Sequence, residues 1–177
     1  AGYSKRFGSD KRKALLPNGM KVLDATLASI PNIFCQRLLV LHEGDESLAQ
    51  QHASWIPVLA VNARSGMGHS VASGIRALDN CKGVLIALAD MPTISVNTYR
   101  TVARLLTKDK IIIPCLQGQR GNPVALGADF FQELAVLEGD NGARTLLQKY
   151  QNAIVRVECN DPGILRDIDT PADFKTN

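Results

Sequence analysis

Short apolar runs recur along the chain, and polar or turn-forming residues bound each of them. The runs are almost continuously apolar, which is typical of strands that are covered on both faces of a sheet. We expect strands over 37–41, 56–61, 84–88, 111–113, 124–126 and 154–157. Pro57 favours an edge position at the start of its strand, because proline has no amide proton for a ladder hydrogen bond.

The segments between these runs repeat apolar residues at helical spacing, over 71–78, 102–106, 130–137 and 145–150. Near the end of the chain, Thr170-Pro171-Ala172-Asp173 offers an N-cap and a proline in the first turn, which predicts a final helix. Alternating strands and helices indicate an α/β fold. We therefore expect a three-layer α/β/α, Rossmann-like architecture with a mostly parallel sheet.

Length and composition are those of an ordinary globular protein. The chain has 177 residues, of which 45% are hydrophobic and 21% are charged. We expect one domain over 1–177, in the cytoplasm, because no apolar run approaches membrane-spanning length and no signal peptide is visible. Net charge is only +3, which argues against a nucleic-acid partner. The chain begins at a turn that should follow a strand, so we expect a first strand to be missing before Ala1.

The cysteines Cys35, Cys81, Cys115 and Cys159 are widely spaced, and none forms a C-x-x-C pair. This spacing argues against a zinc site or a disulfide framework. We expect buried, reduced thiols, which also fits a cytoplasmic location.

The first eleven residues, AGYSKRFGSDK, combine glycines, a serine and basic side chains. Up to Lys13 the chain carries five basic residues and one acidic residue, so the remainder sums to about −1. Glycines let a backbone approach a ligand closely, and exposed amides with Lys and Arg side chains suit a polyphosphate. The loop matches neither the P-loop nor the dinucleotide G-x-G-x-x-G motif. On charge alone, a solvated basic tail is the alternative.

Asp90 directly follows the most apolar of the expected strands, in the sequence Leu88-Ala89-Asp90-Met91-Pro92. Open α/β sheets bind their ligands at the carboxyl ends of the strands. Asp90 is therefore either a helix cap or a Mg²⁺ ligand, and magnesium is usually held by one or two carboxylates together with substrate phosphates.

Four further segments contain turn-forming or polar residues next to an expected element. They are GMGHS at 66–70, QRGNP at 119–123, GDNGAR at 139–144 and DIDTP at 167–171. Each segment has a purely structural alternative, in which it is no more than a helix start, a hairpin turn or a cap.

Taken in order, these segments resemble the MobA-like nucleotidyltransferases, and most nearly the molybdenum cofactor cytidylyltransferases. The resemblance rests on A-G-x-S-x-R-x-G-x-D-K, G-x-G-x-S, L-x-D-M-P, G-N-P, G-D-x-G-A-R and D-I-D-T-P, and spans nearly the whole chain. The family often has G-H-P where this chain has Gly121-Asn122-Pro123, which puts a histidine-dependent substrate contact in doubt. Leu15-Leu16-Pro17 is displaced relative to the family pattern. Lys11 and Lys13 therefore compete for the phosphate role, and we prefer Lys11.

The resemblance implies transfer of CMP from CTP to the terminal phosphate of molybdopterin, with release of pyrophosphate. It implies that Arg6 and Lys11 neutralise phosphate charge and that Asp90, with Asp169 as a second carboxylate, holds Mg²⁺. The nucleotide-binding residues that it implies are Ala1, Gly2, Ser4, Arg6, Lys11, Asn62, Gly66, Ser70 and Asp90. The acceptor-binding residues that it implies are Asn122, Pro123, Asp140, Gly142 and Arg144.

Within the family, an Ala-Gly pair before the loop goes with cytidine and a Gly-Gly pair with guanosine, so Ala1-Gly2 favours CTP. One methyl group gives only ~1–3 kcal/mol of discrimination. GTP is thus the near alternative, and another phosphorylated small molecule could be the acceptor. A recipient molybdoenzyme or its maturation chaperone is an implied partner. A catalytically silent cofactor-binding chaperone is the alternative that is not an enzyme.

Overall fold

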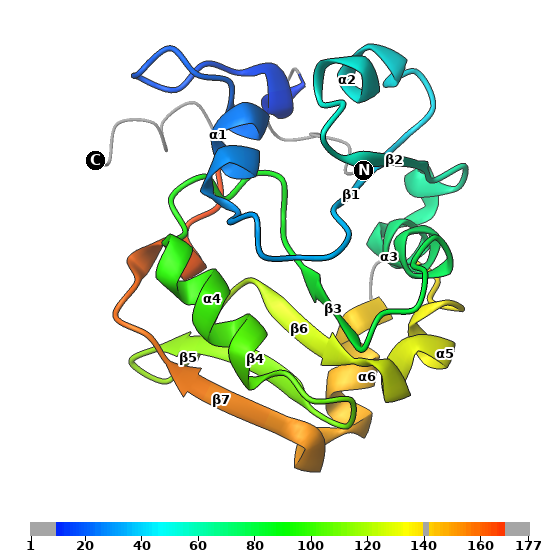
Figure 1. Ribbon diagram of the computed structural model, residues 1–177, viewed down its shortest axis with the longest axis vertical. Coiled ribbons are helices and arrows are strands. Elements are labelled where there is room, and N and C mark those ends of the chain that lie inside the picture. The colour runs from blue at the N-terminus through cyan, green and yellow to red at the C-terminus, as the bar shows by residue number, and fades with distance from the viewer. Residues whose placement is uncertain (1–9, 140–141, 169–177) are drawn as a thin grey trace.

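The computed structural model describes residues 10–139 and 142–168 (Figure 1). Its strands are β1 (Leu38–Leu41), β2 (Ile56–Leu59), β3 (Gly83–Ile86), β4 (Ile111–Leu116), β5 (Gln119–Arg120), β6 (Val124–Gly127) and β7 (Ile154–Glu158). Its α-helices are α1 (Val22–Ser29), α2 (Glu46–Gln51), α3 (Met67–Arg76), α4 (Val96–Leu105), α5 (Phe131–Leu134) and α6 (Gly142–Lys149). Short 3-10 turns lie at Lys11–Lys13, Ala63–Ser65, Ala128–Phe130, Gln151–Ala153 and Pro162–Leu165.

The strands form two sheets. β1 and β2 pair in parallel, and the larger sheet has the order β3-β6-β4-β5, with β7 pairing with β4. β6 runs antiparallel to both β3 and β4, so β3, β4 and β7 all run in one direction. Their carboxyl ends therefore meet at one edge of the sheet, the edge at which α/β proteins bind ligands.

The sheet is more mixed than the apolar runs suggested, because β5 and β6 both run against β4. The segment between β4 and β6 explains this direction. A parallel connection needs a crossover of a dozen or more residues, whereas only the turn at Gln117-Gly118 and the short β5 with 121–123 separate Leu116 from Val124. The chain can only fold back as a hairpin.

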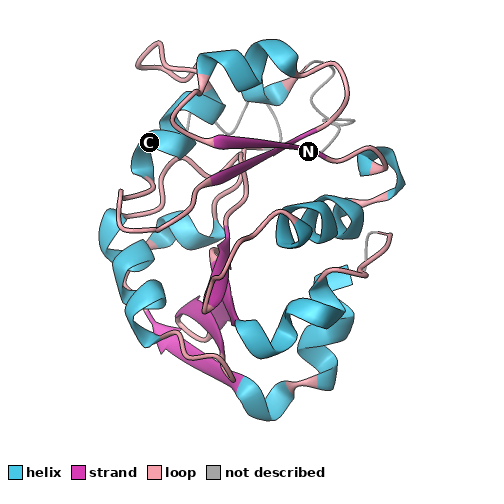
Figure 2. Ribbon diagram, turned by 45° about the vertical axis from the view of Figure 1, so that its right-hand side comes forward, coloured by secondary structure: helices cyan, strands magenta, loops and turns pink. Residues whose placement is uncertain are grey.

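Both faces of the larger sheet are covered, as Figure 2 shows. Ile111 and Ile113 of β4 are fully buried in a cluster with side chains from α3, α5 and α6. Ile112, between them, packs instead with Val102 of α4. Successive residues of a strand point to opposite faces, so the continuous apolar run fills both layers. This arrangement confirms the expected three-layer α/β/α fold.

β1 is likewise enclosed. Leu39 and Leu41 pack with Leu23 of α1 and Leu48 of α2, helices that the apolar spacing had not revealed. α3 contacts β1 from the other side, where Val40 meets the helix at Gly74. The helix expected over 71–78 is α3, which begins earlier, at Met67, and ends at Arg76.

Other expected elements have shifted bounds. The helix expected over 102–106 is α4, which begins earlier, at Val96, where Ser95 caps it with its Oγ accepting a hydrogen bond from the amide of Asn97 (3.2 Å). The helix expected over 130–137 is only the short α5 after a 3-10 turn. The final helix, at Thr170, falls outside the described residues. Among the described residues, no helix combines the length and apolarity that crossing a membrane would require.

Candidate active site

Asp90 follows β3 at the carboxyl edge of the sheet, as expected. Its Oδ2 lies 2.5 Å from Nζ of Lys11, and the two side chains are each only 18% exposed. The other carboxylate oxygen, Oδ1, is buried and accepts no hydrogen bond from the described part of the protein. One oxygen is thus held by a cation, while the second is desolvated and has no partner among the residues that the structure describes. This arrangement suits a further cation.

The two lysines of the basic loop differ in position. Both belong to the 3-10 turn Lys11–Lys13, whose N-cap is Asp10, with its side chain accepting from the amide of Arg12. Lys11 points to Asp90, whereas Lys13 is 57% exposed and its Nζ is 3.8 Å from the Asp10 carboxylate. Of the two candidates for the phosphate role, only Lys11 contacts the Asp90 carboxylate.

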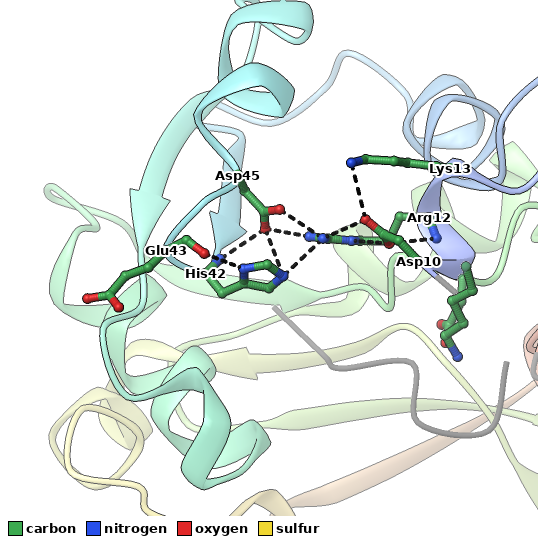
Figure 3. Close-up of polar contacts among 8 residues, drawn as sticks. Asp10, Arg12, Lys13, His42, Glu43 and Asp45 are labelled. Atoms are coloured by element: carbon green, nitrogen blue, oxygen red, sulfur yellow. Dashed lines mark hydrogen bonds and ion pairs between the residues drawn. The ribbon is translucent and has the colours of Figure 1, made fainter. Parts of the chain in front are cut away.

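Arg12 anchors this turn from inside the protein (Figure 3). Its guanidinium donates to both carboxylate oxygens of Asp45, from Nη1 to Oδ2 at 2.5 Å and from Nη2 to Oδ1 at 2.8 Å. It also donates to Asp10, from Nε to Oδ1 at 2.8 Å and from Nη2 to Oδ2 at 2.9 Å. Nη2 is 3.0 Å from Nε2 of His42. Arg12 is 9% exposed and Asp45 is 4% exposed, so the pair is buried.

The charges in this cluster reinforce one another. Burial opposes the charged form of Asp10, but the hydrogen bonds and positive charge of Arg12 outweigh it and lower the pKa of the Asp10 carboxyl. Burial likewise opposes the charge on Arg12, yet Asp10 and Asp45 together raise the pKa of its guanidinium. The turn that presents Lys11 is therefore fastened to the loop between β1 and α2. Sequence reasoning missed this, because Arg12 resembles its exposed neighbour Lys13.

The segment after β7 returns to Asp90. Asp161 accepts hydrogen bonds from Oγ1 of Thr98 (2.5 Å), the amide of Ser95 (2.9 Å) and the amide of Gly163 (3.0 Å). Farther on, the amide of Ile168 donates to the carbonyl of Asp90 (2.9 Å). The chain is thereby pinned beside Asp90, one residue before Asp169.

The expected nucleotide turn at 66–70 begins α3. The amide of Gly68 donates to the carbonyl of Gly139 (2.8 Å), and a Cβ at Gly68 would lie 2.8 Å from that oxygen. Only glycine allows this approach. Ser70 is 7% exposed, and its hydroxyl has no hydrogen-bond partner in the part of the chain that the structure describes. The contact brings the turn against the backbone of Gly139.

A shallow pocket of about 310 Å³ lies beside this turn, between β2 and α3. Asn62, His69 and Arg76 contribute polar groups to it, and Val58 and Val61 contribute apolar surface. Asn62 was expected to bind the nucleotide. The pocket has the mixed polar and apolar lining that small-molecule sites use.

A second pocket, of about 370 Å³, is lined by Arg120, Arg156, Gln151 and Ile154. Arg120 pairs with Cys115 across β4, and Arg156 pairs with Ile113. Cys115 and Ile113 have the same parity along β4, so both arginines project from the face that α6 covers. The described residues offer neither arginine a carboxylate within ion-pair distance. The pocket is therefore a basic one.

Asn122 and Pro123 lie between β5 and β6 and are joined by a cis peptide bond. The amide of Asn122 donates to the carbonyl of Ile164 (2.9 Å). Ile86, the last residue of β3, pairs with Val124, the first residue of β6, so Asn122 and Pro123 precede β6 at the end of the sheet where β3 ends. The segment therefore reaches the same edge of the sheet as Asp90.

The remaining expected site residues lie either on α6 or outside the described part of the chain. Gly142 starts α6 and Arg144 is exposed on it. Leu146 of this helix packs in the cluster of Ile111 and Ile113, so α6 lies on the face with the two arginines. The expected residues that lie outside the described part of the chain are Ala1, Gly2, Ser4, Arg6, Asp140 and Asp169. Within that part, no group of three or more His, Cys, Asp or Glu side chains could hold a metal ion.

Comparisons with known proteins identify the family to which the chain belongs. A family model described as the MobA-like NTP transferase domain matches residues 1–154. The purine catabolism protein PucB of Bacillus subtilis is 30% identical over 98% of this chain and 90% of its own length. The nicotine blue oxidoreductase of Paenarthrobacter nicotinovorans is 28% identical, over 96% and 89%. The molybdenum cofactor cytidylyltransferase of Escherichia coli is 25% identical, over 99% and 91%.

Solved structures share the fold. A nucleotidyl transferase from Methanothermobacter superimposes with a TM-score of 0.82 at 21% identity, covering 99% of this chain and 91% of that one. A homologue of Rv0371c from a Mycobacterium strain gives 0.79 at 25% identity, covering 99% and 89%. Rv0371c of Mycobacterium tuberculosis, in complex with manganese, gives 0.74 at 22% identity, covering 96% and 91%.

Proposed function

The chain belongs to the MobA-like NTP transferase family, and from this premise we propose that it transfers CMP from CTP to the terminal phosphate of molybdopterin. In this reaction an oxygen of the acceptor phosphate forms a bond to the α-phosphorus of CTP. The bond from that phosphorus to the β-phosphate breaks, and pyrophosphate leaves. We take 1–177 as one nucleotidyltransferase domain that works in the cytoplasm.

The observation that carries the proposal is the 2.5 Å contact between Lys11 and Asp90 at the carboxyl edge of the sheet. A structural ion pair would need only one carboxylate oxygen and no opening to a ligand. Here the second oxygen of Asp90 is buried and has no partner among the described residues. A lysine paired with a half-satisfied carboxylate suits the simultaneous binding of a triphosphate and a cation.

The donor set fits Mg²⁺. Carboxylate oxygens are hard ligands, and magnesium is commonly held by one or two of them with substrate phosphates completing its shell. Asp90 would hold the ion, with Asp169 as the second carboxylate. Asp169 directly follows Ile168, whose amide donates a hydrogen bond to the Asp90 carbonyl. When bound, Mg²⁺ supplies Lewis-acid polarisation of a phosphoryl oxygen.

The protein's own residues position the reactants and neutralise charge. Phosphoryl chemistry leaves little covalent work to an enzyme, so orientation and electrostatic stabilisation dominate. Lys11 donates to a phosphate oxygen as negative charge grows on the leaving pyrophosphate, and Arg6 assists it. Gly2 and Ser4 line the phosphate loop. The buried Arg12–Asp45 pair keeps the Lys11 turn in one orientation, so the ammonium does not have to be reorganised during the reaction.

The nucleoside end would lie along the turn that starts α3. Ser70 offers a buried hydroxyl without a partner in the described chain, and Gly66 lets the turn approach a ligand closely. Asn62, which lines the pocket beside α3, can read the base through its amide. Ala1 would favour a pyrimidine, because a methyl group beside the base would leave less space for a purine.

The acceptor would lie toward α6. Asn122 and Pro123 lie at the Asp90 edge of the sheet, and Asp140, Gly142 and Arg144 would complete the acceptor site. Arg120 and Arg156 add a basic pocket on the face that α6 covers. Two guanidiniums suit the phosphate of an anionic acceptor, since each can donate two parallel hydrogen bonds. A recipient molybdoenzyme, or its maturation chaperone, would take the product.

The test is pyrophosphate release by the purified protein with Mg²⁺ and molybdopterin, compared among CTP, GTP, ATP and UTP. We expect release with CTP well above the other nucleotides, and a nucleotide-dependent rise in melting temperature with the same order. Preference for GTP would assign guanylyl transfer instead. Pterin binding without pyrophosphate release from any nucleotide would replace the enzyme with a silent cofactor chaperone.

A further inference from the structure

Cys35 and Cys81 lie side by side on the surface, although 46 positions separate them in the sequence. Their sulfur atoms are 3.8 Å apart. Cys35 is exposed and Cys81 is half-buried, so the expectation of buried thiols is wrong for these two. Cys115 is buried, as expected. We propose that Cys35 and Cys81 are a thiol modification site that closes to a reversible intramolecular disulfide when a small disulfide oxidant such as oxidised glutathione is present.

The loops that carry the two cysteines hold each other. The side-chain amide of Gln36 donates to the carbonyl of Asp79 (2.6 Å), and the amide of Asp79 donates back to Oε1 of Gln36 (3.2 Å). This reciprocal pair lies next to Cys35 and two residues before Cys81, so the thiols stay together in the reduced protein. Their proximity is therefore built by other contacts and does not depend on a bond between the sulfurs.

The backbone around the pair can accommodate the bond. Cys35 lies in the segment between α1 and β1, and Cys81 lies between α3 and β3, both outside helices and strands. A disulfide requires the sulfurs to close to about 2 Å. Rotation about the side-chain bonds, with a small shift of two irregular segments, provides this movement without disturbing a ladder or a helix.

The two thiols have different roles in the exchange. Cys35 is the exposed sulfur, which a small oxidant reaches first. Cys81 donates to the carbonyl of Asp79 (3.4 Å), and burial, followed by the contact with Cys35, raises the pKa of its thiol. The Cys35 thiolate attacks the oxidised glutathione and releases one glutathione. The Cys81 thiolate then attacks the Cys35 sulfur and releases the second, so the protein's two electrons end on two glutathione thiols.

The bond would form away from the candidate active site. Cys35 and Cys81 precede the amino ends of β1 and β3, whereas Asp90 follows the carboxyl end of β3. Oxidation would tie the exit of α3 to the entry of β1 and leave the Lys11–Asp90 pair untouched. We therefore expect greater thermal stability with turnover close to that of the reduced protein. The rise in Tm should be about 5 °C or more, because the bond closes a long loop.

The experiment treats the full chain with oxidised glutathione at about pH 8, where thiolates form readily, and follows it by intact mass and a non-reducing peptide map. We expect a monomer that has lost two thiol hydrogens, a Cys35–Cys81 peptide, a higher Tm, and full reversal by dithiothreitol. Cys81→Ser should instead keep a stable glutathione adduct on Cys35. Cys159→Ser, the matched control, should form the same disulfide as the unaltered chain.

Several results would overturn the proposal. They are a full count of titratable thiols after oxidation, a stable glutathione adduct on Cys35 of the unaltered chain, and a linkage that involves Cys115 or Cys159. A disulfide that joins two chains would also contradict it. Circular dichroism of Cys81→Ser establishes that this variant is folded, and Cys35→Ser provides a second variant that must lose the disulfide.

Discussion

The ammonium of Lys11 and the carboxylate of Asp90 meet at 2.5 Å, although β1 and β2 and the helices around them separate the two residues along the chain. The contact joins the basic loop to the carboxyl end of β3. Neither residue is held only by the other, because the Lys11 turn is anchored through Arg12 and the Asp90 carbonyl accepts from Ile168. The pair is thus positioned from both sides, as the roles proposed for its two members require.

Lys11→Ala should lower kcat/KM for CTP by about a hundredfold, because an ammonium directed at a leaving phosphate stabilises the transition state strongly. Lys13→Ala, its matched control, removes the same charge from an exposed side chain. It should change kcat/KM by about threefold or less, and less again at high salt. Steady-state kinetics at low and high ionic strength make the comparison. Equal, salt-sensitive losses in both variants would mean a diffuse basic field and no specific contact.

Asp90→Asn should abolish most turnover and leave the fold intact. An amide cannot supply the negative charge that holds a divalent ion, so we expect a loss of about a hundredfold or more. Stability should fall less than in Arg12→Ala, because the side-chain oxygen of an asparagine can still accept a hydrogen bond from Lys11, which is partly exposed. Pyrophosphate release and thermal melting measure the two effects, with the exposed Asp129→Asn as control. A folded Asp90→Asn protein with normal release would remove Asp90 from the metal site.

Arg12→Ala should be strongly destabilising, because it leaves the buried Asp45 carboxylate without its cation. Breaking a buried ion pair from one side costs about 3–5 kcal/mol. Arg12→Lys keeps the charge but not the two parallel hydrogen bonds, so its unfolding free energy in urea should fall by a smaller amount. At a temperature where Arg12→Lys is folded, its KM for CTP should rise because the Lys11 turn is held less firmly. An unchanged KM would separate the anchor from nucleotide binding.

The Asp10 carboxyl should contribute to the pH dependence of stability. Its pKa in the folded protein is lowered from an ordinary value of 3.8. As the pH falls, the Asp10 carboxyl of the unfolded chain is therefore protonated before that of the folded chain. The stabilisation is fully present above pH 3.8 and is lost as the pH falls through the lower pKa of the folded state. The difference in unfolding free energy between the unaltered chain and Asp10→Asn should therefore shrink below that pH. A difference that stays constant under acid titration would contradict the ion pair.

Arg120→Ala and Arg156→Ala should weaken the binding of the anionic acceptor and leave CTP binding unchanged. We expect the KM for molybdopterin to rise about tenfold in each, since a hydrogen bond to a charged group is worth ~1.5–3 kcal/mol. Arg104→Ala, on the opposite face of the sheet, controls for the loss of one positive charge. Should all the arginine variants behave alike, the basic pocket would have no specific role in acceptor binding.

Much of the fold follows from local apolar pattern. The runs at 84–88 and 111–113 predict strands covered on both faces, and β3 and β4 are such strands. The direction of β6 does not follow, because it depends on the shortness of the β4–β6 connection and not on the residues of the strand. α1 and α2 were missed for a related reason, since they pack on the small β1–β2 sheet through few side chains.

The candidate site was predictable only where chemistry shows in the residue type. Asp90 after an apolar strand, and a lysine in a glycine-bearing basic loop, point to phosphate and metal. The choice between Lys11 and Lys13 needs the fold, because only Lys11 faces Asp90. Arg12 and Asp45 are joined across 33 positions, and no local pattern distinguishes the buried arginine from the lysines on either side. The contact between Cys35 and Cys81 is equally a product of tertiary structure.

The most direct test follows the fate of labelled CTP in a reaction with molybdopterin and Mg²⁺. With the label on the α-phosphate, we expect radioactivity in a pterin–cytosine dinucleotide, in amounts equal to the pyrophosphate formed. With the label on the γ-phosphate, it should appear only in pyrophosphate. Label from the γ-phosphate in the acceptor, or release of inorganic phosphate in place of pyrophosphate, would contradict nucleotidyl transfer.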